Sequence, residues 1–271
     1  MDSAGSEAKL LFQHSLDVNT RDSYWSTQLH HAAYKGDTGT CELLIRKGAD
    51  VNAQNQDQWT PLHKAAYKGH AGTCKVLILS GAEIDARDQG QATPLNWAAY
   101  GDHSTTCELL IRAKADVNAK NKAQWTPLHQ SANKGNTETC ELLIDAGAEV
   151  NVRNKEQDTP LHRAAGWDNT ETCELLIQKG ADVMARGKDQ DTPLHRAARY
   201  DRTEICYLLV RSGAEVTAKN KEGRTPLDLA GGSETRHFLM VTPDSAIFSL
   251  LPNFKFSWHK NCKGVMTCSQ I

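Results

Sequence analysis

A four-residue motif, Thr-Pro-Leu-His, recurs along this chain at a fixed spacing. The motif or a close variant begins at seven threonines, each 33 residues after the last: Thr27, Thr60, Thr93, Thr126, Thr159, Thr192 and Thr225. No insertion interrupts the series. Self-similarity at a period of about 20–50 residues is the signature of a stack of repeated supersecondary units. We therefore expect one elongated repeat structure in place of one or two compact domains.

Each motif contains the signals that start a helix. Threonine can cap the free amides of the first helical turn. Proline at the next position loses nothing, because its missing N–H would be unpaired there in any case. In the second repeat these signals predict a helix over 61–68, with Leu62, Ala65 and Ala66 facing inward. Gly69 then permits the positive φ that ends the helix.

A second helix and a turn complete each repeat. Cys74, Leu77 and Ile78 are spaced as on one face of a helix, which predicts a second helix from Gly72 to Ser80. The polar segment 82–88 is expected to form a β-turn finger that leads to the next threonine. No single repeat can bury its apolar face, so stability has to come from stacking.

These features resemble ankyrin repeats. The resemblance is carried by the Thr-Pro-Leu-His-x-Ala-Ala segments, the Cys-Glu-Leu-Leu-Ile helices and the Gly-Ala-Asp-Val-Asn turns. It covers residues 24 to about 230 and implies an all-α repeat fold: an ankyrin solenoid of antiparallel helix pairs with β-turn fingers. The repeats are assigned to 24–56, 57–89, 90–122, 123–155, 156–188 and 189–221, with a degenerate seventh repeat that begins at 222.

Both flanks of the repeats depart from the pattern. Residues 1–23 are interpreted as a capping half-repeat, because Asp17, Val18 and Asn19 stand 33 residues before their counterparts in the first full repeat. Residues 231–271 are expected to form an irregular C-terminal cap or tail, since a glycine pair interrupts the first helix of the seventh repeat. His259, Cys262 and Cys268 lack the fourth ligand of a structural zinc site, so no metal is expected.

Six of the eight cysteines follow the same 33-residue spacing: Cys41, Cys74, Cys107, Cys140, Cys173 and Cys206. Stacked helices lie about 8–10 Å apart, whereas a disulfide needs Cα atoms within about 7 Å. We therefore expect free thiols in the core and a reducing compartment. The net charge of −2 attracts neither nucleic acid nor membrane. With no signal peptide and no membrane span in the sequence, the chain is expected to be a cytoplasmic or nuclear monomer.

Enzymatic chemistry finds no support in the motifs. The chain has no G-x-S-x-G elbow and no phosphate-binding P-loop, so neither catalysis nor a cofactor is predicted. The motif histidines would lie too far apart to share a metal. They are His30, His63, His129, His162 and His195. The resemblance implies that they hydrogen-bond to the backbone of neighbouring turns.

Three turn asparagines have two interpretations. Asn52, Asn118 and Asn151 each follow an acidic residue and a valine, and asparagine side chains commonly bond to the backbone of a turn. The resemblance adds another interpretation, because the Leu-x5-[Asp/Glu]-Val-Asn pattern is similar to that of sites of asparaginyl hydroxylation. Both interpretations stay open at this point.

One face of the first helices collects aromatic and basic residues. The fourth, seventh and eighth residues after each threonine share that face, and the resemblance implies that it lines a concave surface together with the fingers. Five of the six tryptophans and five of the six tyrosines lie on or beside it. The predicted partner-binding residues are Trp59, Tyr34, Tyr67, Lys68, Trp97, Tyr100, Trp125, Lys134, Arg163, Trp167, Arg196, Arg199 and Tyr200.

Aromatic and arginine side chains are enriched at binding hot spots. The sequence therefore favours a non-catalytic scaffold or adaptor that binds an acidic segment of another protein on its concave face. One alternative is a sensor of a nucleotide or short RNA, because arginine and aromatic rings suit phosphates and bases. Another is a substrate-recruiting subunit of a ubiquitin ligase, although residues 231–271 contain no recognisable docking motif.

Overall fold

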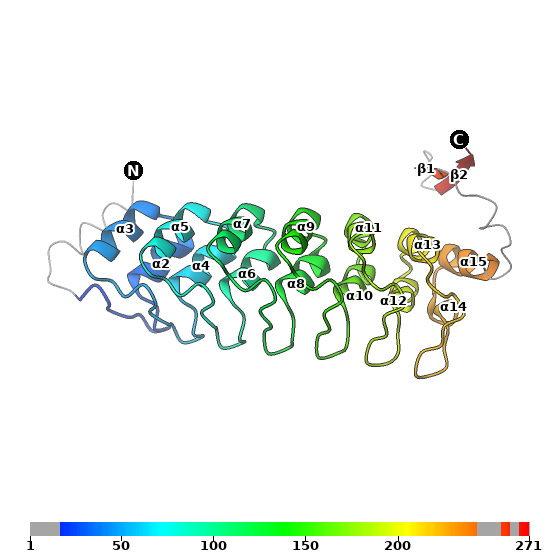
Figure 1. Ribbon diagram of the computed structural model, residues 1–271, viewed down its shortest axis with the longest axis horizontal. Coiled ribbons are helices and arrows are strands. Elements are labelled where there is room, and N and C mark those ends of the chain that lie inside the picture. The colour runs from blue at the N-terminus through cyan, green and yellow to red at the C-terminus, as the bar shows by residue number, and fades with distance from the viewer. Residues whose placement is uncertain (1–16, 243–255, 261–265, 271) are drawn as a thin grey trace.

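A computed structural model describes residues 17–242, 256–260 and 266–270, and it contains two parallel rows of helices (Figure 1). The inner row consists of the first helix of each repeat: α2 (Gln28–Lys35), α4 (Pro61–Tyr67), α6 (Pro94–Tyr100), α8 (Pro127–Lys134), α10 (Pro160–Ala165), α12 (Pro193–Arg199) and α14 (Pro226–Leu229). The outer row consists of α3 (Thr38–Arg46), α5 (Ala71–Leu79), α7 (Ser104–Arg112), α9 (Thr137–Asp145), α11 (Thr170–Gln178), α13 (Thr203–Arg211) and α15 (Ser233–Val241). Each helix packs on the next one in its own row and on its partner in the other row. The predicted solenoid of helix pairs is confirmed.

The threonine of each motif caps an inner helix as expected. At α4, the Thr60 hydroxyl accepts a hydrogen bond from the His63 amide, and the His63 side chain bonds back to the amide of Thr60. This reciprocal arrangement is a capping box. It fixes the first turn of the inner helix and, with it, the direction in which the side chains of that helix point.

The core is a continuous column of apolar side chains between the two rows. In the second repeat, Leu62 and Leu77 are fully buried together with Cys74. All six repeat cysteines are buried and free, as predicted. Burial raises the pKa of the Cys74 thiol to about 12, so these thiols are protonated at neutral pH and act as small apolar core residues.

The ends of the outer helices require a left-handed residue. Gly81 and Gly147 adopt φ values of 92° and 97° there, and a Cβ added to either would meet nothing within 4 Å. The requirement is therefore one of backbone conformation and not of space. Lys114 occupies the same position with φ 74°. Lysine thus replaces glycine at a position that needs the left-handed region.

The ends of the inner helices differ between repeats. Aspartate replaces the usual glycine at three of these positions, and Asp102 and Asp201 do adopt the left-handed region, with φ 58° and 54°. Asp168 does not. Helix α10 ends early, at Ala165, and Gly166 continues with φ −75°, so the chain turns before it reaches Asp168.

The fingers along the lower edge of Figure 1 are tight turns joined to one another. In the third repeat's finger, the Asp88 amide donates to the Ala92 carbonyl at 3.0 Å. Each finger also donates one backbone hydrogen bond to the finger before it, for example from Lys122 to Gly90 at 2.8 Å. Gln58, two residues before the motif threonine of the second repeat, has a φ of 61°. Glutamine adopts this strained, left-handed conformation at the same position in four further fingers.

The repeat histidines link each inner helix to the next finger. His63 Nε2 bonds to the carbonyl of Ala92 at 3.1 Å, while its Nδ1 contacts the amide and hydroxyl of Thr60. The other four histidines make the same two sets of bonds. The implied structural role is confirmed. The third repeat lacks the link, because Asn96 replaces histidine and its amide reaches Ala119 instead, at 3.3 Å.

The C-terminal region is more regular than expected. Residues 233–241 form α15, whose Thr235 and Leu239 are buried and which packs against α13 and α14. The glycine pair before it does not disrupt the stack, because the amides of Gly231 and Gly232 both donate to the Asp201 carboxylate. Beyond α15, an antiparallel hairpin joins β1 (Phe256–Lys260) to β2 (Met266–Gln270).

The remaining flank predictions fall largely outside the described residues. Most of the N-terminal half-repeat, residues 1–16, is among them, as is Cys262. Asn19 is described, and its side chain bonds to the Gly48 carbonyl and the Asp50 amide. These are the bonds that the equivalent asparagines of later repeats make.

Candidate protein-binding face

The aromatic residues predicted for the concave face do gather. Trp59, Tyr67 and Trp97 form a cluster in which each ring contacts the other two, with centroids 4.8–5.7 Å apart. Tyr100 extends it, with its centroid 6.0 Å from that of Trp97. Most of these pairs are edge-to-face, the geometry that aromatic quadrupoles prefer. The cluster spans the inner helices α4 and α6 and the finger between α3 and α4.

Lysines cover the N-terminal side of this cluster. The Lys68 ammonium group lies 4.7 Å from the ring centre of Tyr34 and 5.4 Å from that of Tyr67. Lys64 lies 4.7 Å from the ring centre of Trp59. Cation–π contacts of this kind hold a lysine near a ring without neutralising its charge. Within the described residues, Lys64 and Lys68 therefore contact rings and pair with no carboxylate.

The face continues toward the C-terminus through further contacts of the same type. Lys134 lies 4.4 Å from the ring centre of Tyr100, and the Arg163 guanidinium lies 4.6 Å from that of Trp125. Asn133 then accepts hydrogen bonds from Arg163 and from the indole of Trp167. We use the name aromatic–basic face for the surface formed by these side chains on the inner helices and fingers. Its residues are Tyr34, Trp59, Lys64, Tyr67, Lys68, Trp97, Tyr100, Trp125, Asn133, Lys134, Arg163, Trp167, Arg196, Arg199 and Tyr200.

Buried carboxylates beneath this face change the charge that the sequence suggested. Asp158, whose side chain is 1% exposed, bonds to both Arg163 and Arg196. Asp191 bonds to Arg199 at 2.7 Å. In the first six repeats, the fourth, seventh and eighth residues after each motif threonine include no acidic residue. The position before the threonine, however, holds these two aspartates in repeats five and six. The basic charge of the C-terminal half is therefore partly neutralised.

The same position could have revealed these partners. It holds Trp59 and Trp125 in two repeats and Asp158 and Asp191 in two others, so an aspartate there is the sequence signal for a partner to the arginines of the face. A third carboxylate, Asp88, lies at the base of a finger and accepts a hydrogen bond from the Trp97 indole at 2.9 Å. Because Asp88 is 3% exposed, Trp97 has a structural role as well as any role in binding.

The aromatic side chains of the face differ in how much of their surface is exposed to solvent. Tyr34, Trp167 and Tyr200 are 43%, 54% and 50% exposed, so their rings present large surfaces to solvent. The central cluster is only partly exposed. The face thus has a rigid aromatic centre flanked by exposed rings, with Tyr34 on one side and the Trp167–Tyr200 pair on the other.

The turn asparagines are fully engaged between repeats. The Asn52 amide donates to the Gly81 carbonyl and its oxygen accepts from the Glu83 amide. Asn118 and Asn151 make the equivalent bonds. These bonds between turns therefore explain why an asparagine recurs at this position of the repeat. Hydroxylation stays a prediction.

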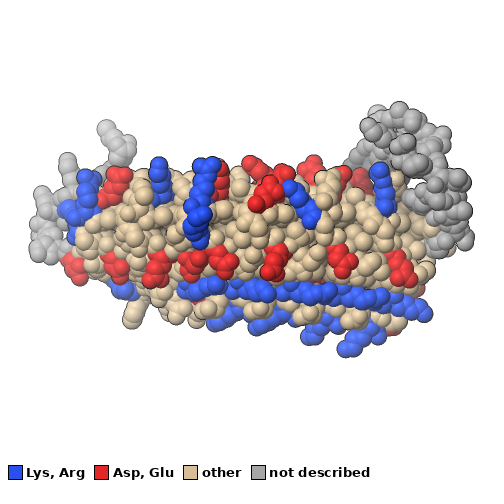
Figure 2. Space-filling model, viewed as in Figure 1, with Lys and Arg blue, Asp and Glu red and all other residues tan. Residues whose placement is uncertain are grey.

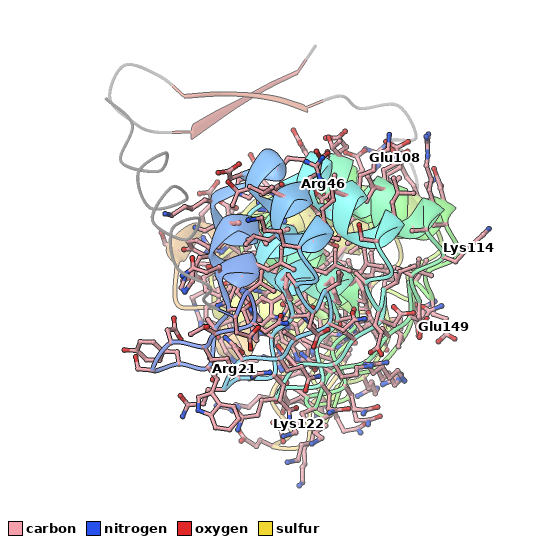
Figure 3. All side chains as sticks on the ribbon, turned by 90° about the vertical axis from the view of Figure 1, so that its left-hand side faces the viewer. Arg21, Arg46, Glu108, Lys114, Lys122 and Glu149 are labelled. Carbon is pink, nitrogen blue, oxygen red and sulfur yellow. The ribbon has the colours of Figure 1, made fainter. Side chains whose placement is uncertain are left out.

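A second charge pattern lies on the side of the molecule shown in Figure 2, where Lys and Arg follow the finger edge and Asp and Glu form a row above them. Viewed along the stack, Lys122 lies at the end of a finger, with Glu149 nearer the helices (Figure 3). Finger arginines tie neighbouring fingers together, as when Arg87 donates to the Lys120 carbonyl at 2.8 Å. The basic residues of the finger edge therefore include side chains that hold neighbouring fingers together.

Neither a metal centre nor a membrane-spanning helix occurs in the described part of the chain. No three His, Cys, Asp or Glu side chains gather there as they would around a metal ion. Each helix of the same part is too short or too polar to cross a membrane.

Comparison with known proteins decides the family. A family model of three ankyrin repeats matches residues 4–88, 29–121 and 95–187, and a single-repeat model matches residues 189–221. This chain belongs to the ankyrin repeat family. Ankyrin repeats are in general protein–protein interaction modules. No curated protein matches the sequence significantly.

Solved ankyrin repeat domains have the same architecture. The ankyrin repeat domain of human ASB11 is 27% identical, with a TM-score of 0.76, and the match covers 81% of this chain and 99% of that one. The ankyrin repeat domain of Bcl-3, a member of the IkappaB protein family, is 28% identical, with a TM-score of 0.69. That match covers 79% of this chain and 98% of the other.

Proposed function

We propose that this ankyrin repeat protein is a non-catalytic adaptor that binds another protein through its aromatic–basic face. The observation that carries the proposal is the run of ring and cation contacts from Tyr34 to Lys134, with a further contact between Trp125 and Arg163, on the aromatic–basic face. Rings that are about half exposed lie at both ends of this face. Pre-packed aromatic and cationic groups lose little conformational freedom on binding, which favours affinity.

The partner is proposed to present an acidic, extended segment. Lys64, Lys68 and Lys134 contact rings but no carboxylate in the described structure, whereas Arg163, Arg196 and Arg199 are already paired with aspartates. The acidic residues of the partner are therefore expected to meet the lysines of repeats two to four. Complementary charge there raises the association rate more than the final affinity.

The test compares partner capture by the wild-type chain and by the double variant Tyr34→Ala/Lys68→Ala. Both side chains are exposed, so their removal leaves the stack folded. Trp97→Ala is avoided, because it would leave Asp88 buried without its indole partner. Against a purified partner, the double variant is expected to lose at least about 2 kcal/mol of binding free energy, roughly 30-fold in Kd.

A matched control lies on the outer row. Leu79 is 77% exposed on α5, and Leu79→Ala should bind the partner like wild type. Loss of binding in Leu79→Ala with retention in Tyr34→Ala/Lys68→Ala would place the partner on the outer helices and contradict the proposal. A short single-stranded RNA that binds the wild-type chain more tightly than any captured protein would favour the sensor alternative.

A further inference from the structure

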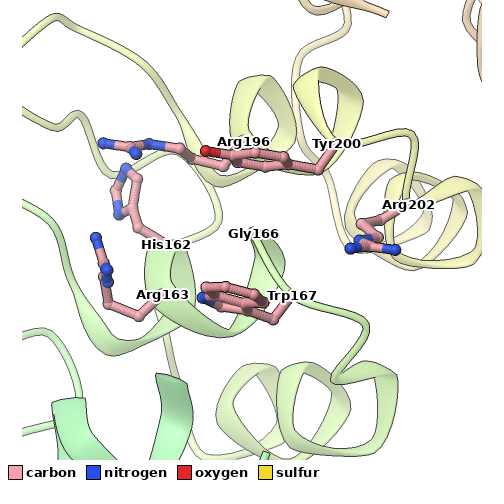
Figure 4. A pocket seen from close by; sticks show the side chains of 7 residues that line it. All are labelled: His162, Arg163, Gly166, Trp167, Arg196, Tyr200 and Arg202. Atoms are coloured by element: carbon pink, nitrogen blue, oxygen red, sulfur yellow. The ribbon is translucent and has the colours of Figure 1, made fainter. Parts of the chain in front are cut away.

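A pocket opens on the aromatic–basic face between α10 and α12 (Figure 4). Its volume is about 130 Å³, and its walls include Arg163, Gly166, Trp167, Arg196, Tyr200 and Arg202. Figure 4 shows the rings of Trp167 and Tyr200 on either side of Gly166, with Arg202 at the opposite end of the pocket from Arg163 and Arg196. The pocket thus has aromatic walls and basic ends.

The pocket exists because one side chain is missing. The position of Gly166 holds a tyrosine in each of the first three repeats: Tyr34, Tyr67 and Tyr100. A Cβ added to Gly166 would lie 3.7 Å from Tyr200 Cε2, so a larger side chain there would enter the space beside the Tyr200 ring. Because α10 ends at Ala165, the Gly166 backbone forms the floor between the two rings.

The pocket has more positive charge than its own carboxylates neutralise. Asp158 is shared by Arg163 and Arg196. Arg202 makes no ion pair within the described residues. The Nε atoms of Arg196 and Arg202 are both buried without a hydrogen-bond acceptor, and a buried donor left unpaired is unfavourable. An anion in the pocket would supply the missing charge and acceptors.

The walls define the rest of the ligand. Trp167 and Tyr200 are 54% and 50% exposed, and two aromatic walls favour a planar ring between them. Arginine is the preferred residue for phosphate, because its guanidinium group presents several donors in one plane. The pocket therefore suits an aromatic ring that carries a phosphate group.

We propose that this pocket binds the phosphotyrosine side chain of a partner protein, with the ring between Trp167 and Tyr200 and the phosphate against Arg202. The partner side of this inference rests on the proposed function. A nucleotide combines the same two groups, but small-molecule sites usually exceed roughly 300 Å³, more than twice the volume found here. A single side chain fits better.

The test uses defined probes and the full chain, so it does not depend on finding the natural partner. Isothermal titration calorimetry would compare N-acetyl-phosphotyrosine amide with N-acetyl-tyrosine amide, inorganic phosphate and AMP. Phosphotyrosine is expected to bind at least about tenfold more tightly than each of the other three. Equal or tighter binding of AMP would reassign the pocket to a nucleotide. Equal binding of phosphate, or no binding at millimolar probe, would overturn the proposal.

Two variants locate the binding. Gly166→Tyr fills the pocket with the residue found at this position in repeats one to three, and Arg202→Gln removes the unpaired charge. Both should weaken phosphotyrosine binding at least about tenfold with an unchanged melting temperature. Tyr34→Ala/Lys68→Ala is the matched control and should bind the probe normally. Loss in that control alone would place the probe elsewhere.

A readout within the wild-type chain covers the case in which a variant does not fold. With 5-fluorotryptophan incorporated, the ¹⁹F resonance of Trp167, assigned through Trp167→Phe, should shift on addition of phosphotyrosine, while that of Trp59 should not. Probe binding with failure of the Tyr34/Lys68 test would retain the pocket and reject the larger face. The converse would reject only the pocket.

Discussion

Each motif histidine links two repeats through hydrogen bonds that require its imidazole ring to be neutral. A carbonyl can only accept a hydrogen bond, so the contact to Ala92 places the proton of His63 on Nε2. An amide can only donate, so the contact from Thr60 requires a lone pair on Nδ1. A second proton on Nδ1 would break that contact. Burial also lowers the pKa of His30, His63 and His129 to about 4.

The histidines should therefore make stability depend on pH. Their pKa is about 4 in the fold and about 6.5 in the unfolded chain. The native state thus binds fewer protons, and the free energy of unfolding should fall as pH decreases from about 6.5 toward 4. Urea denaturation at pH 7.5 and pH 5 measures the difference. His63→Asn, which copies the third repeat, should show a smaller fall than wild type; an identical fall would contradict this account.

The backbone at Lys114 gives a second residue-scale prediction. Because Lys114 adopts φ 74° where Gly81 and Gly147 stand in other repeats, Lys114→Gly should relieve strain and stabilise the stack by about 1 kcal/mol. The reverse substitution, Gly147→Lys, should destabilise it by a similar amount. Urea midpoints of both variants measure the effect. Destabilisation by Lys114→Gly would show that the lysine side chain makes a compensating contact.

At the scale of the element, the helices were predictable and several of their contacts were not. Threonine caps and glycine ends are short-range signals, so α4 and α5 begin and end within one residue of the predicted bounds. The early end of α10 and the pairing of Asp158 with two arginines depend on neighbouring repeats. The same is true of α15, because the glycine pair that seemed to break the repeat is held by Asp201 from the repeat before.

Helix α15 is expected to protect the end of the stack. Leu239 is 1% exposed, whereas its neighbour Met240 is 60% exposed. Leu239→Ala should lower the free energy of unfolding by about 2–4 kcal/mol and speed hydrogen exchange in α13. Met240→Ala is the matched control and should change neither. Equal effects of the two substitutions would show that α15 does not cover the last full repeat.

At the scale of the whole molecule, the stack is held by links between neighbours, and one junction has fewer of them. Repeats three and four lack the histidine link because of Asn96, and Lys114 strains the same junction. Repeat proteins gain stability from the interfaces between adjacent units. The stack therefore has a weak point near its middle, in addition to its two ends.

Opening should begin at this junction. Native-state hydrogen exchange is expected to show a lower opening free energy for amides of α6 to α9 than for those of α4 or α12. In the double variant Asn96→His/Lys114→Gly, the new histidine can reach the Trp125 carbonyl, which is the equivalent of Ala92. The difference should then disappear. Faster exchange at α6 to α9 in the double variant would refute the assignment.

The histidine links all point one way along the chain. Each of the five histidines donates its bond to a backbone carbonyl 29 residues later, in the next finger, as His195 does to Arg224. On a ribosome, a repeat that has already emerged must therefore wait for the next finger before its histidine is satisfied. Folding during synthesis should lag translation by one repeat. The last link forms once Arg224, just before α14, has emerged.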